Sequence, residues 1–545
     1  MAIVIAVLFA VLPIVAVWLY KVVRVLNSSR GQPGYIAIIQ PFHEYGFAFF
    51  PVSRWNLQVN YMWKTKTDLY RKYNSNVLVI PSLFPPVVTI LIADAQAINK
   101  INNDHRNFSK DPFSNGSVSR LFGSNIITLE GSEWRRHRKV IVAGFSESNT
   151  AEVWNATIDI AGQWMDRILK EAGNDQVLVN NSESVWAVLA LLIMGKAGFG
   201  IDLGWPSSPT SPIELTTSGT NAFYAAAARI LKDWAPLTIL PSIFLRPYPL
   251  TSYLKRVANV RDTFDKEINK LVKKRIEGVK EEAVAGDEKK RDILTLLCRA
   301  NVLEDAKAKL SDEELIGNAF IFLIAGHETT AGTLASAFAF LALYPSYQTS
   351  IYEEATIAFE NGSPSYPSTY HSLPSTLAVI YESLRLAGPA STLLRRATAA
   401  TSVPSKVIDK NGSYVANSSI VVPKGSYMRE NVLGVHYSED WESPTEFKPE
   451  RFIKNENSSE QMKSFLPFNS GSRGCIGKQF SLVESVAFLS FVVLKYKIEI
   501  PPHNKEEWAL KENESLNDRH DRVLKPGNFF TLGPTGIDLL FVPRE

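Results

Sequence analysis

A single long helical pattern, starting after Leu310, constrains this chain more than any other feature of its sequence. Ser311 and Glu314 have the spacing of a capping box, which marks a helix start. The pattern then stays apolar for about 30 residues, and at about 1.5 Å per residue such a helix is about 45 Å long and crosses a whole domain. Its centre carries the segment AGHETT, Ala325–Thr330. A buried helix rarely carries a glutamate and two threonines at its centre without a functional reason, because burying unpaired polar groups is costly.

The rest of the chain predicts a mainly α-helical fold with a smaller β-rich portion. Apolar residues recur at helical spacing over most of the region from Asp94 to Leu386. Strand and hairpin patterns lie on both sides of it, at 76–80, at 87–92, past Pro389 and in the tail at 527–543, and a further helix is predicted at 478–496. Since 45% of the residues are hydrophobic, the chain can bury a sizeable core. No segment after residue 34 reads as a linker, so we predict one catalytic domain over residues 29–545.

The N-terminus has the pattern of a membrane anchor. Residues 2–20 carry no charge, and as a helix they would span about 28 Å, close to the roughly 30 Å core of a bilayer. Trp18 follows the aromatic-belt pattern, and Lys21, Arg24 and Arg30 come directly after the run, which places the C-terminal side in the cytosol. The alternative is a cleaved signal peptide, but no basic region precedes the run and no small-residue cleavage site is evident. We therefore predict a single-pass anchor over residues 1–28.

Charge and cysteine content narrow the partners and the compartment. The formal net charge is +3, which gives no sign of the basic patch that nucleic-acid binding needs, so we predict no nucleic-acid partner. Two cysteines in 545 residues cannot form a disulfide framework. A reducing, cytosolic environment is the natural expectation for most of the chain.

One of the two cysteines, Cys475, has unusual neighbours. Gly471, Gly474 and Gly477 surround it, Arg473 lies two residues before it, and a helical pattern begins directly after it. A helix N-terminus stabilises a thiolate, and the glycines let the backbone approach something flat and bulky. The residue could instead be a buried apolar thiol, the commonest fate of a lone cysteine. Zinc is disfavoured because no second Cys or His lies at ligand spacing, and a nucleophile would need a nearby histidine. A thiolate, a glycine wall and a cation fit the proximal ligation of haem.

The motif Phe468-x-x-Gly471-x-Arg473-x-Cys475-x-Gly477 resembles the haem-binding signature of the cytochrome P-450 superfamily, the haem-thiolate monooxygenases. Four further segments resemble motifs of this family in the family's order, and the resemblance covers roughly residues 30–545. They are WRRHR at 134–138, AGHETT at 325–330, ESLR at 382–385 and PERF at 449–452.

The resemblance, closest in texture to microsomal fungal members, implies the cytochrome P-450 fold and its chemistry. The cofactor would be haem b, iron protoporphyrin IX, with Cys475 as the axial ligand of the iron. Molecular oxygen would be the co-substrate, and electrons would come from NADPH through a separate, membrane-bound NADPH–cytochrome P-450 reductase. One oxygen atom would enter a hydrophobic small-molecule substrate. The chain would lie at the endoplasmic reticulum membrane with its catalytic domain in the cytosol.

The resemblance also assigns roles to individual residues. Trp134 and Arg138, spaced i and i+4, can reach one ligand together, and with Arg473 they would meet the haem propionates. Arg395 corresponds to a further propionate arginine, although the adjacent Arg396 remains an alternative. The remaining cofactor contacts would be Phe468, Gly471 and Gly477. Glu382, Arg385 and Arg451 would form a buried structural triad, since a buried pair leaves groups unfilled unless a third joins.

Two segments leave alternatives open. Glu328 and Thr329 would deliver protons during oxygen activation, with Gly326 permitting local widening of the helix; alternatively Thr329 only bonds a backbone carbonyl one turn earlier. Arg135, Arg136 and Lys139 are expected to face outward, as a solvated surface or as a docking patch for an acidic reductase.

Two alternative functions are also open. Members of the family that isomerise or dehydrate peroxides tend to lose the acid–alcohol pair, which is present here as Glu328 and Thr329. A haem carrier or sensor would not need this pair.

Overall fold

The computed structural model describes fourteen stretches of the chain, and every structural statement below concerns these residues. They are 2–41, 59–110, 123–173, 176–205, 226–227, 230, 252–285, 292–302, 309–360, 364–408, 415, 418–453, 458–527 and 531–544. The chain divides into two compact units, each assembled from three separate chain segments. The first consists of Met1–Asp111, Ala390–Pro444 and Ser459–Gly474, and the second of Pro112–Pro389, Thr445–Ser458 and Cys475–Glu545.

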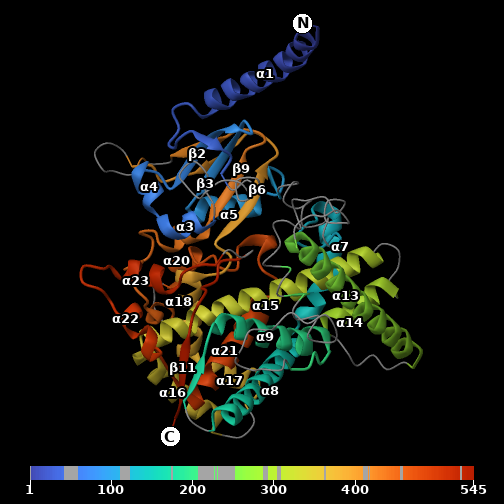
Figure 1. Ribbon diagram of the computed structural model, residues 1–545, viewed down its shortest axis with the longest axis vertical. Helices are drawn as coiled ribbons and strands as arrows, with labels where there is room; N and C mark the ends of the chain where they lie inside the picture. The colour runs from blue at the N-terminus through green and yellow to red at the C-terminus, as the bar shows by residue number, and fades with distance from the viewer. Residues whose placement is uncertain are drawn as a thin grey trace. The chain divides into compact units, whose positions relative to one another are not determined.

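The first unit is built on a mixed six-stranded sheet with the order β1-β2-β3-β9-β6-β4, whose blue and orange strands lie side by side in Figure 1. Antiparallel β2 and β3 form the sequence-local part of it, while β9 pairs with β3 in parallel and with β6 antiparallel. The strands are β1 (Ala37–Ile39), β2 (Val77–Phe84), β3 (Val87–Ile92), β4 (Phe108–Ser109), β6 (Thr392–Ala397) and β9 (Tyr427–Asn431), with β7 (Thr401–Pro404) and β8 (Ser419–Val422) as a separate hairpin.

The helices of the first unit are mostly short. They are α1 (Ala2–Ser29), α3 (Val59–Thr65), α4 (Asp68–Lys72), α5 (Ala95–Asn103), α19 (Val432–His436), α20 (Ser458–Lys463) and the 3₁₀ turn η4 (Gly471–Arg473). Asp94 caps α5 by accepting a hydrogen bond from the Ala97 amide, and α5 buries Ile98 and Ile101 against Met428 and other core residues of the sheet. The core of this unit therefore fixes the C-terminal end of α5.

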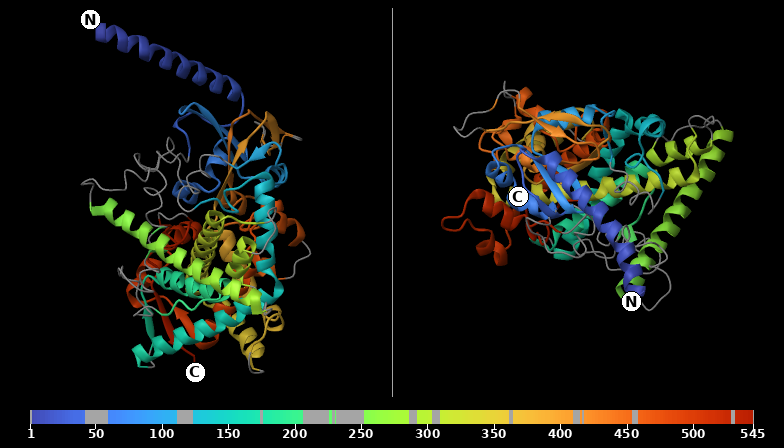
Figure 2. Two further views of the ribbon diagram at one scale, coloured as in Figure 1. Left: turned by 90° about the vertical axis from the view of Figure 1, so that its right-hand side faces the viewer. Right: turned by 90° about the horizontal axis from the view of Figure 1, so that it is seen from above.

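Helix α1 is the only described helix long and apolar enough to cross a membrane by length and composition, over Val11–Ser29. It projects from the rest of the first unit as one continuous helix (Figure 2). In its second half, eleven residues before Ser29, the indole Nε1 of Trp18 donates to the Leu83 carbonyl at 3.1 Å, and the Trp18 ring stacks on Phe84 with centroids 5.0 Å apart. The second half of α1 is thus attached to β2 by specific contacts.

The second unit is a helical assembly around α15 (Asp312–Leu343), the long helix predicted from the sequence. The capping box of Ser311 and Glu314 is present, which confirms the predicted start. The other helices are α7 (Gly131–Val142), α8 (Glu147–Ala172), α9 (Ser182–Ile193) with the π-helical turn η2 (Met194–Gly198), α13 (Ser252–Ala285), α14 (Ile293–Val302), α16 (Ser346–Phe359), α17 (Ser368–His371), α18 (Pro374–Ala387), α21 (Lys478–Lys495), α22 (Lys505–Trp508) and α23 (Leu516–Val523). Short 3₁₀ turns lie at η1 (Ala143–Phe145), η3 (Pro449–Phe452) and η5 (Pro502–Asn504).

Aromatic side chains from four elements hold the centre of this unit together. Trp186 of α9 stacks on Phe338 of α15 with ring centroids 4.8 Å apart, and Trp164 of α8 meets Trp186 edge-on at 5.3 Å. Phe488 of α21 packs edge-on against the Trp186 ring. Such pairs contribute beyond the area that they bury, so the cluster ties α15 to the helices on either side of it.

A small antiparallel sheet of order β10-β11-β5 completes the second unit, with β10 (Tyr496–Glu499), β11 (Leu539–Pro543) and β5 (Val177–Val179). The mainly α-helical class with a smaller β portion is confirmed. Two predicted strands differ in length from those in the structure. Strand β2 was predicted to end at residue 80 but continues to Phe84, because its last residues pair with β1 and β3. In the predicted β tail only Leu539–Pro543 is a strand among the described residues.

Candidate functional site

The middle of α15 differs from the rest of the helix in keeping accessible side chains. The helix is largely buried from Leu315 to Leu343, yet Ala325, Gly326, Glu328 and Thr329 retain partial exposure. The AGHETT segment is therefore a part of α15 that a bound group can reach.

Thr329 makes the backbone contact that sequence reasoning named as the alternative to proton delivery. Its hydroxyl Oγ1 donates to the Ala325 carbonyl at 2.7 Å. Threonines in helices commonly make this bond to the carbonyl one turn earlier. Thr333, one turn later, donates in the same way to the Thr329 carbonyl at 2.8 Å. In this arrangement the Thr329 hydroxyl keeps its acceptor lone pairs but has already used its single proton.

The local widening expected at Gly326 is not seen, because α15 is an α-helix throughout from Asp312 to Leu343. A close neighbour packs on the glycine: a Cβ at position 326 would lie 2.0 Å from Cε of Met194, the flexible end of that side chain, so a larger residue would require Met194 to move. The same methionine also fills the space above Gly198, where a Cβ would lie 2.4 Å from its sulfur. The thioether of Met194 therefore occupies a slot between two glycines.

The carboxyl group of Glu328 has a pKa close to neutral pH. Burial raises the pKa of Glu328 from 4.5 to about 7, while hydrogen bonds from the side chain and backbone of Thr531 act in the opposite direction. Its Oε1 is buried and has no hydrogen-bond partner among the described residues. A carboxyl group with a pKa near 7 can both hold and release a proton at physiological pH, as a general acid must.

The raised pKa predicts a pH-dependent stability. The folded state binds more protons than the unfolded state between pH 4.5 and about 7, so the free energy of unfolding falls as pH rises through this window. The full difference is on the order of 3 kcal/mol. Thermal unfolding of the wild type and of Glu328→Gln, measured from pH 5 to 8, should show the variant losing less stability as pH rises. Parallel curves would contradict the raised pKa, and Glu353→Gln, at an exposed position of α16, is the matched control.

Cys475 lies three residues before α21, as the sequence pattern indicated, and Gly477 is the N-cap of this helix. The side chain is exposed, yet enough protein surrounds the sulfur that burial raises the pKa of the thiol. The Gly477 amide and the positive charge of Lys478 act in the opposite direction but do not outweigh it. A sulfur that is both accessible and closely surrounded lies in a recess with one open side.

The residues before Cys475 belong to the first unit and contact the end of α5. Gly471 has a φ of 69°, and a Cβ there would lie 2.8 Å from the Asn103 side-chain oxygen and 3.1 Å from the Asn102 carbonyl. Glycine is therefore needed at 471 for both conformation and space. Phe468 is half-buried before this turn, and Arg473 is half-buried within η4.

Two of the predicted propionate donors lie together on α7. Trp134 and Arg138 are both half-buried, and the guanidinium carbon of Arg138 lies 5.5 Å from the centre of the Trp134 ring. This cation–π contact holds two hydrogen-bond donors on one face of the helix.

The choice between Arg395 and Arg396 follows from strand alternation in β6. Arg396 lies over the Tyr427 ring at 5.3 Å, whereas the Arg395 side chain is only 6% exposed. The guanidinium of Arg395 donates to the Leu394 carbonyl and to Oδ1 of Asn102, both at 2.9 Å. Its remaining N–H groups have no partner among the described residues, so Arg395 is the better candidate for an anionic ligand.

One surface prediction on α7 is wrong. Arg135 and Lys139 are exposed as expected, but the Arg136 side chain is only 18% exposed because it binds Glu314 of α15. Its guanidinium donates to both carboxylate oxygens of Glu314, which also caps α15. Although partial burial acts against it, hydrogen bonds from Arg136, Ser311 and His137 lower the pKa of Glu314 to about 2. Arg136 therefore fixes α7 to the start of α15 and does not belong to a docking patch.

Glu382 and Arg385 form a fully buried ion pair on α18. The guanidinium of Arg385 donates through Nε and Nη2 to the two carboxylate oxygens of Glu382, both at 2.8 Å, with both side chains 0% exposed. Arg451 of η3 adds a third group, with its Nε 3.1 Å from Glu382 Oε1. The Lys448 amide donates to the same oxygen at 2.9 Å, and Arg385 donates to the Glu446 carbonyl at 3.0 Å. The carboxylate thus ties the segment from Glu446 to Arg451 to α18.

Sequence reasoning missed two residues that act on these positions. Asn102 contacts Arg395, and Thr531 contacts Glu328. The partners of these pairs are far apart in sequence, so no spacing rule could have found them. The sequence also predicts substrate-facing segments at 108–122, 221–234 and 529–532, and most of these residues lie outside the described part of the chain.

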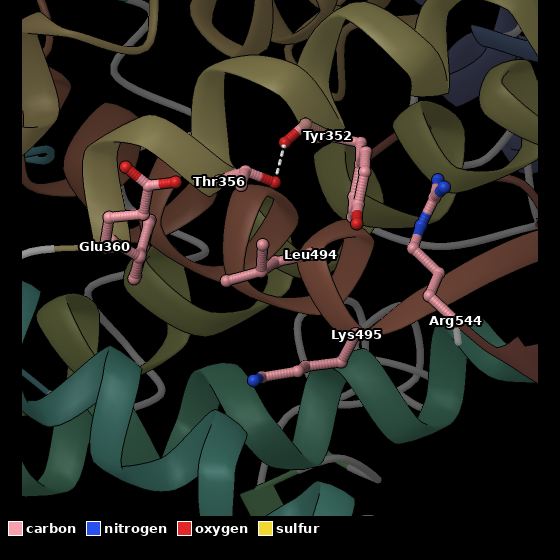
Figure 3. A pocket seen from close by; sticks show the side chains of 7 residues that line it. Tyr352, Thr356, Glu360, Leu494, Lys495 and Arg544 are labelled. Carbon is pink, nitrogen blue, oxygen red and sulfur yellow. Dashed lines mark hydrogen bonds between the residues drawn. The ribbon is translucent and has the colours of Figure 1, made fainter.

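A shallow cavity of about 340 Å³ lies elsewhere in the second unit (Figure 3). It is lined by Tyr352, Thr356, Phe359, Glu360, Leu494, Lys495 and Arg544. Leu494 and Lys495 are at the C-terminal end of α21, so the cavity lies about 27 Å along this helix from the end that follows Cys475. This cavity is therefore separate from the residues that carry the chemistry.

Comparison with known proteins identifies the family to which this chain belongs. The cytochrome P450 family model matches residues 54–522. The chain is 32% identical to cytochrome P450 monooxygenase 124 of Postia placenta, over 89% of this chain and 88% of the relative. It is 25% identical to cytochrome P450 3A11 of Mus musculus, over 85% and 87%, and 27% identical to lithocholate 6-beta-hydroxylase of Mesocricetus auratus, over 85% and 86%. The chain belongs to the cytochrome P450 family.

Family membership makes the chain an oxidoreductase, a monooxygenase of organic substrates that uses haem and molecular oxygen. The donor set of the structure fits this cofactor. A single accessible thiol precedes α21, the backbone at Gly471 allows no side chain, and Arg395 keeps unused donors although it is buried. Haem supplies the oxygen activation when it is bound.

Proposed function

We propose that the chain is a membrane-anchored haem-thiolate monooxygenase that takes electrons from NADPH through a separate NADPH–cytochrome P-450 reductase. It inserts one atom of molecular oxygen into a hydrophobic small-molecule substrate. The observation that carries the proposal is the accessible sulfur of Cys475, directly before α21 and within the family's signature. The test is NADPH-dependent product formation by the purified chain with a reductase. Equal turnover with peroxide alone and none with NADPH would contradict the electron route.

The residue roles follow from the family motifs in which these residues stand and from the chemistry of their side chains. Cys475 would bind the haem iron, with Phe468, Gly471 and Gly477 forming the wall of the ligand loop. Trp134, Arg138, Arg395 and Arg473 would hold the propionates, since an indole N–H and guanidinium groups are donors suited to carboxylate oxygens. Glu382, Arg385 and Arg451 would hold the segment that leads toward Cys475 in place.

The exposed cations of α7 support docking of the reductase. Arg135 and Lys139 are both exposed on the same helix as Trp134 and Arg138. A double charge reversal, Arg135→Glu with Lys139→Glu, should slow reduction by the reductase at low salt, with a smaller effect at high salt because exposed charges are screened. Stopped-flow reduction rates measure this. Equal rates for wild type and variant at low ionic strength would place the docking surface elsewhere.

Glu328 and Thr329 would deliver protons during oxygen activation. Glu328, with a pKa of about 7, can exchange a proton with solvent. Thr329 must give up its bond to the Ala325 carbonyl when it donates elsewhere, which a hydroxyl does by rotation. The proposed role of Thr329 therefore requires its hydroxyl to change its hydrogen-bond partner. A Thr329 variant with a normal haem spectrum can test this.

The Thr329→Ala variant should keep a normal haem spectrum and consume NADPH, but direct more electrons to hydrogen peroxide and fewer to product. Thr333→Ala is the matched control, because Thr333 makes the same kind of bond, to the Thr329 carbonyl, one turn later. Product and peroxide formed per NADPH measure the coupling. If both variants remain as well coupled as the wild type, Thr329 serves only its backbone contact and the proton-delivery role is wrong.

The membrane location would rest on α1. We propose a single-pass anchor in the endoplasmic reticulum membrane with the catalytic part in the cytosol, supported by the uncharged run and by Lys21, Arg24 and Arg30 after it. Removing residues 1–28 should move the protein toward the soluble fraction while sparing the reduced-CO spectrum. Some association can persist, because Phe84 is 54% exposed even with Trp18 stacked on it. Carbonate-resistant insertion after the truncation would place the anchor elsewhere.

A further inference from the structure

Asn102, the second-last residue of α5, joins three separate segments of the first unit through one side chain. It is fully buried at 0% exposure. Its Oδ1 accepts the hydrogen bond from Arg395 at 2.9 Å, and its Nδ2 donates to Oε2 of Glu430 at 3.2 Å and to Oδ1 of Asn469 at 2.7 Å. A primary amide can accept on one side and donate on the other, which neither Asp nor Leu of similar size can do.

Asn102 lies between two buried ionisable side chains, Arg395 and Glu430. Glu430 is also 0% exposed, and its Oε1 has no hydrogen-bond partner among the described residues. Glu430 lies on β9 opposite Leu393, and thus on the same face of the sheet as Arg395. Asn102 hydrogen bonds both charged groups and thereby limits how far the guanidinium of Arg395 can turn toward the carboxylate.

The same amide reaches the glycine-rich segment before Cys475. Asn469 has a φ of 60°, and its Oδ1 accepts from both Asn102 and the Ser470 amide, which is 2.7 Å away. The end of α5 also closes over Gly471, where a Cβ would meet the Asn102 carbonyl at 3.1 Å. His105 adds a contact to Ser472, with Nε2 and Oγ 2.7 Å apart. The orientation of Arg395 and the conformation of residues 469–472 are therefore set by one element.

We propose that Asn102 is a positioning residue that holds the Arg395 guanidinium, relative to the segment 469–472, in the orientation needed to bind a haem propionate. The inference rests on the proposed roles of Arg395 and of the Cys475 signature. Arg395 is prepared for a carboxylate because its other N–H groups are unpaired among the described residues, while its hydrogen bonds to Leu394 and Asn102 fix the plane of the guanidinium. Asn102 itself touches neither the propionate nor the iron in this proposal.

The first experiment measures haem retention by the full-length holoenzyme. Asn102→Ala should lose haem to apomyoglobin roughly tenfold faster than the wild type, because a hydrogen bond that orients a charged group is lost. Gln96→Ala is the control, since Gln96 is an exposed residue of the same helix. Equal loss rates for wild type and Asn102→Ala would overturn the inference.

The second experiment tests whether Asn102 acts through Arg395. In a double-mutant cycle with Arg395→Gln, the two changes together should accelerate haem loss by clearly less than the product of their separate effects. Multiplicative effects would show that Asn102 acts independently of Arg395 and would overturn the inference. Where Asn102→Ala fails to fold, Asn102→Ser, which keeps one hydrogen-bonding group, takes its place in both experiments. Failure of both to fold would mean that Asn102 is a structural residue only.

The outcome is separate from that of the proposed function. A wild-type chain without the red-shifted reduced-CO band would defeat the haem-thiolate proposal, whatever Asn102 does. A wild type with this band, together with unchanged haem retention in the Asn102 variants, would defeat only the positioning role.

Discussion

The Cys475→Ala variant is expected to lose the red-shifted reduced-CO absorption band entirely, and product formation with it. The band depends on a thiolate bound to the haem iron, and alanine offers no ligand atom. Since Cys475 is exposed, the substitution creates no cavity in the core. We therefore expect the variant to fold and to differ from the wild type mainly in its spectrum.

The second cysteine is the matched control for this experiment. Cys298 is fully buried on α14, and burial raises the pKa of its thiol to about 12, so it remains a protonated, apolar side chain. Cys298→Ala should keep the band and cost only some stability. A Cys475→Ala enzyme that retains the band would mean that another group binds the iron, and the assignment of the whole signature would be wrong.

The Glu382→Ala variant is expected to fail in folding and not in catalysis. The substitution leaves Arg385 without either of its bonds to Glu382 and removes one acceptor of Arg451 and of the Lys448 amide, while the Arg385 side chain stays 0% exposed. Removing one partner of such a pair costs about 3–5 kcal/mol, a large share of the roughly 5–15 kcal/mol that stabilises a whole protein. We expect aggregated or haem-free material on expression, measured as soluble yield and haem content.

Glu382→Gln separates the charge from the shape of this side chain. The amide oxygen can still accept from Arg385, but the NH₂ group faces donors instead of accepting from them, so the variant should lie between the wild type and Glu382→Ala. Glu353→Ala, at an exposed position of α16, should be neutral. Soluble, fully haem-loaded Glu382→Ala protein would show that the pair contributes no more than a surface ion pair, which is typically worth 0–1 kcal/mol.

The parts of the fold that follow from local chemistry could be predicted from the sequence. The capping box of Ser311 and Glu314, the length of α15 and the start of α21 after Gly477 depend on residues within one or two turns of each other. The same holds for β3, which has the predicted bounds Val87–Ile92. Periodicity and caps are local signals, so one sequence is sufficient to read them.

What could not be predicted depends on which distant residue lies nearby. Arg136 carries the same charge as Arg135, and only the position of Glu314, 178 residues away, decides that it is bound while its neighbour is exposed. Gly326 was expected to widen the helix, whereas in the structure the Met194 side chain from the π-helical turn η2 packs against it. The pKa of Glu328 likewise results from burial and from Thr531, neither of which a helical pattern reveals.

The interleaved construction of the two units has a consequence for synthesis. Strand β3 pairs with β9, and Thr89 lies opposite Tyr427, which is synthesised about 340 residues later. At roughly 5–20 residues per second, this delay is on the order of tens of seconds. During this interval the parallel edge of β3 has no partner, and such an edge can template wrong pairings. Residues 59–110 therefore leave the ribosome as an incomplete sheet that depends on the last quarter of the chain. Chaperone capacity and translation speed, more than final stability, should then limit how much functional protein a host cell produces.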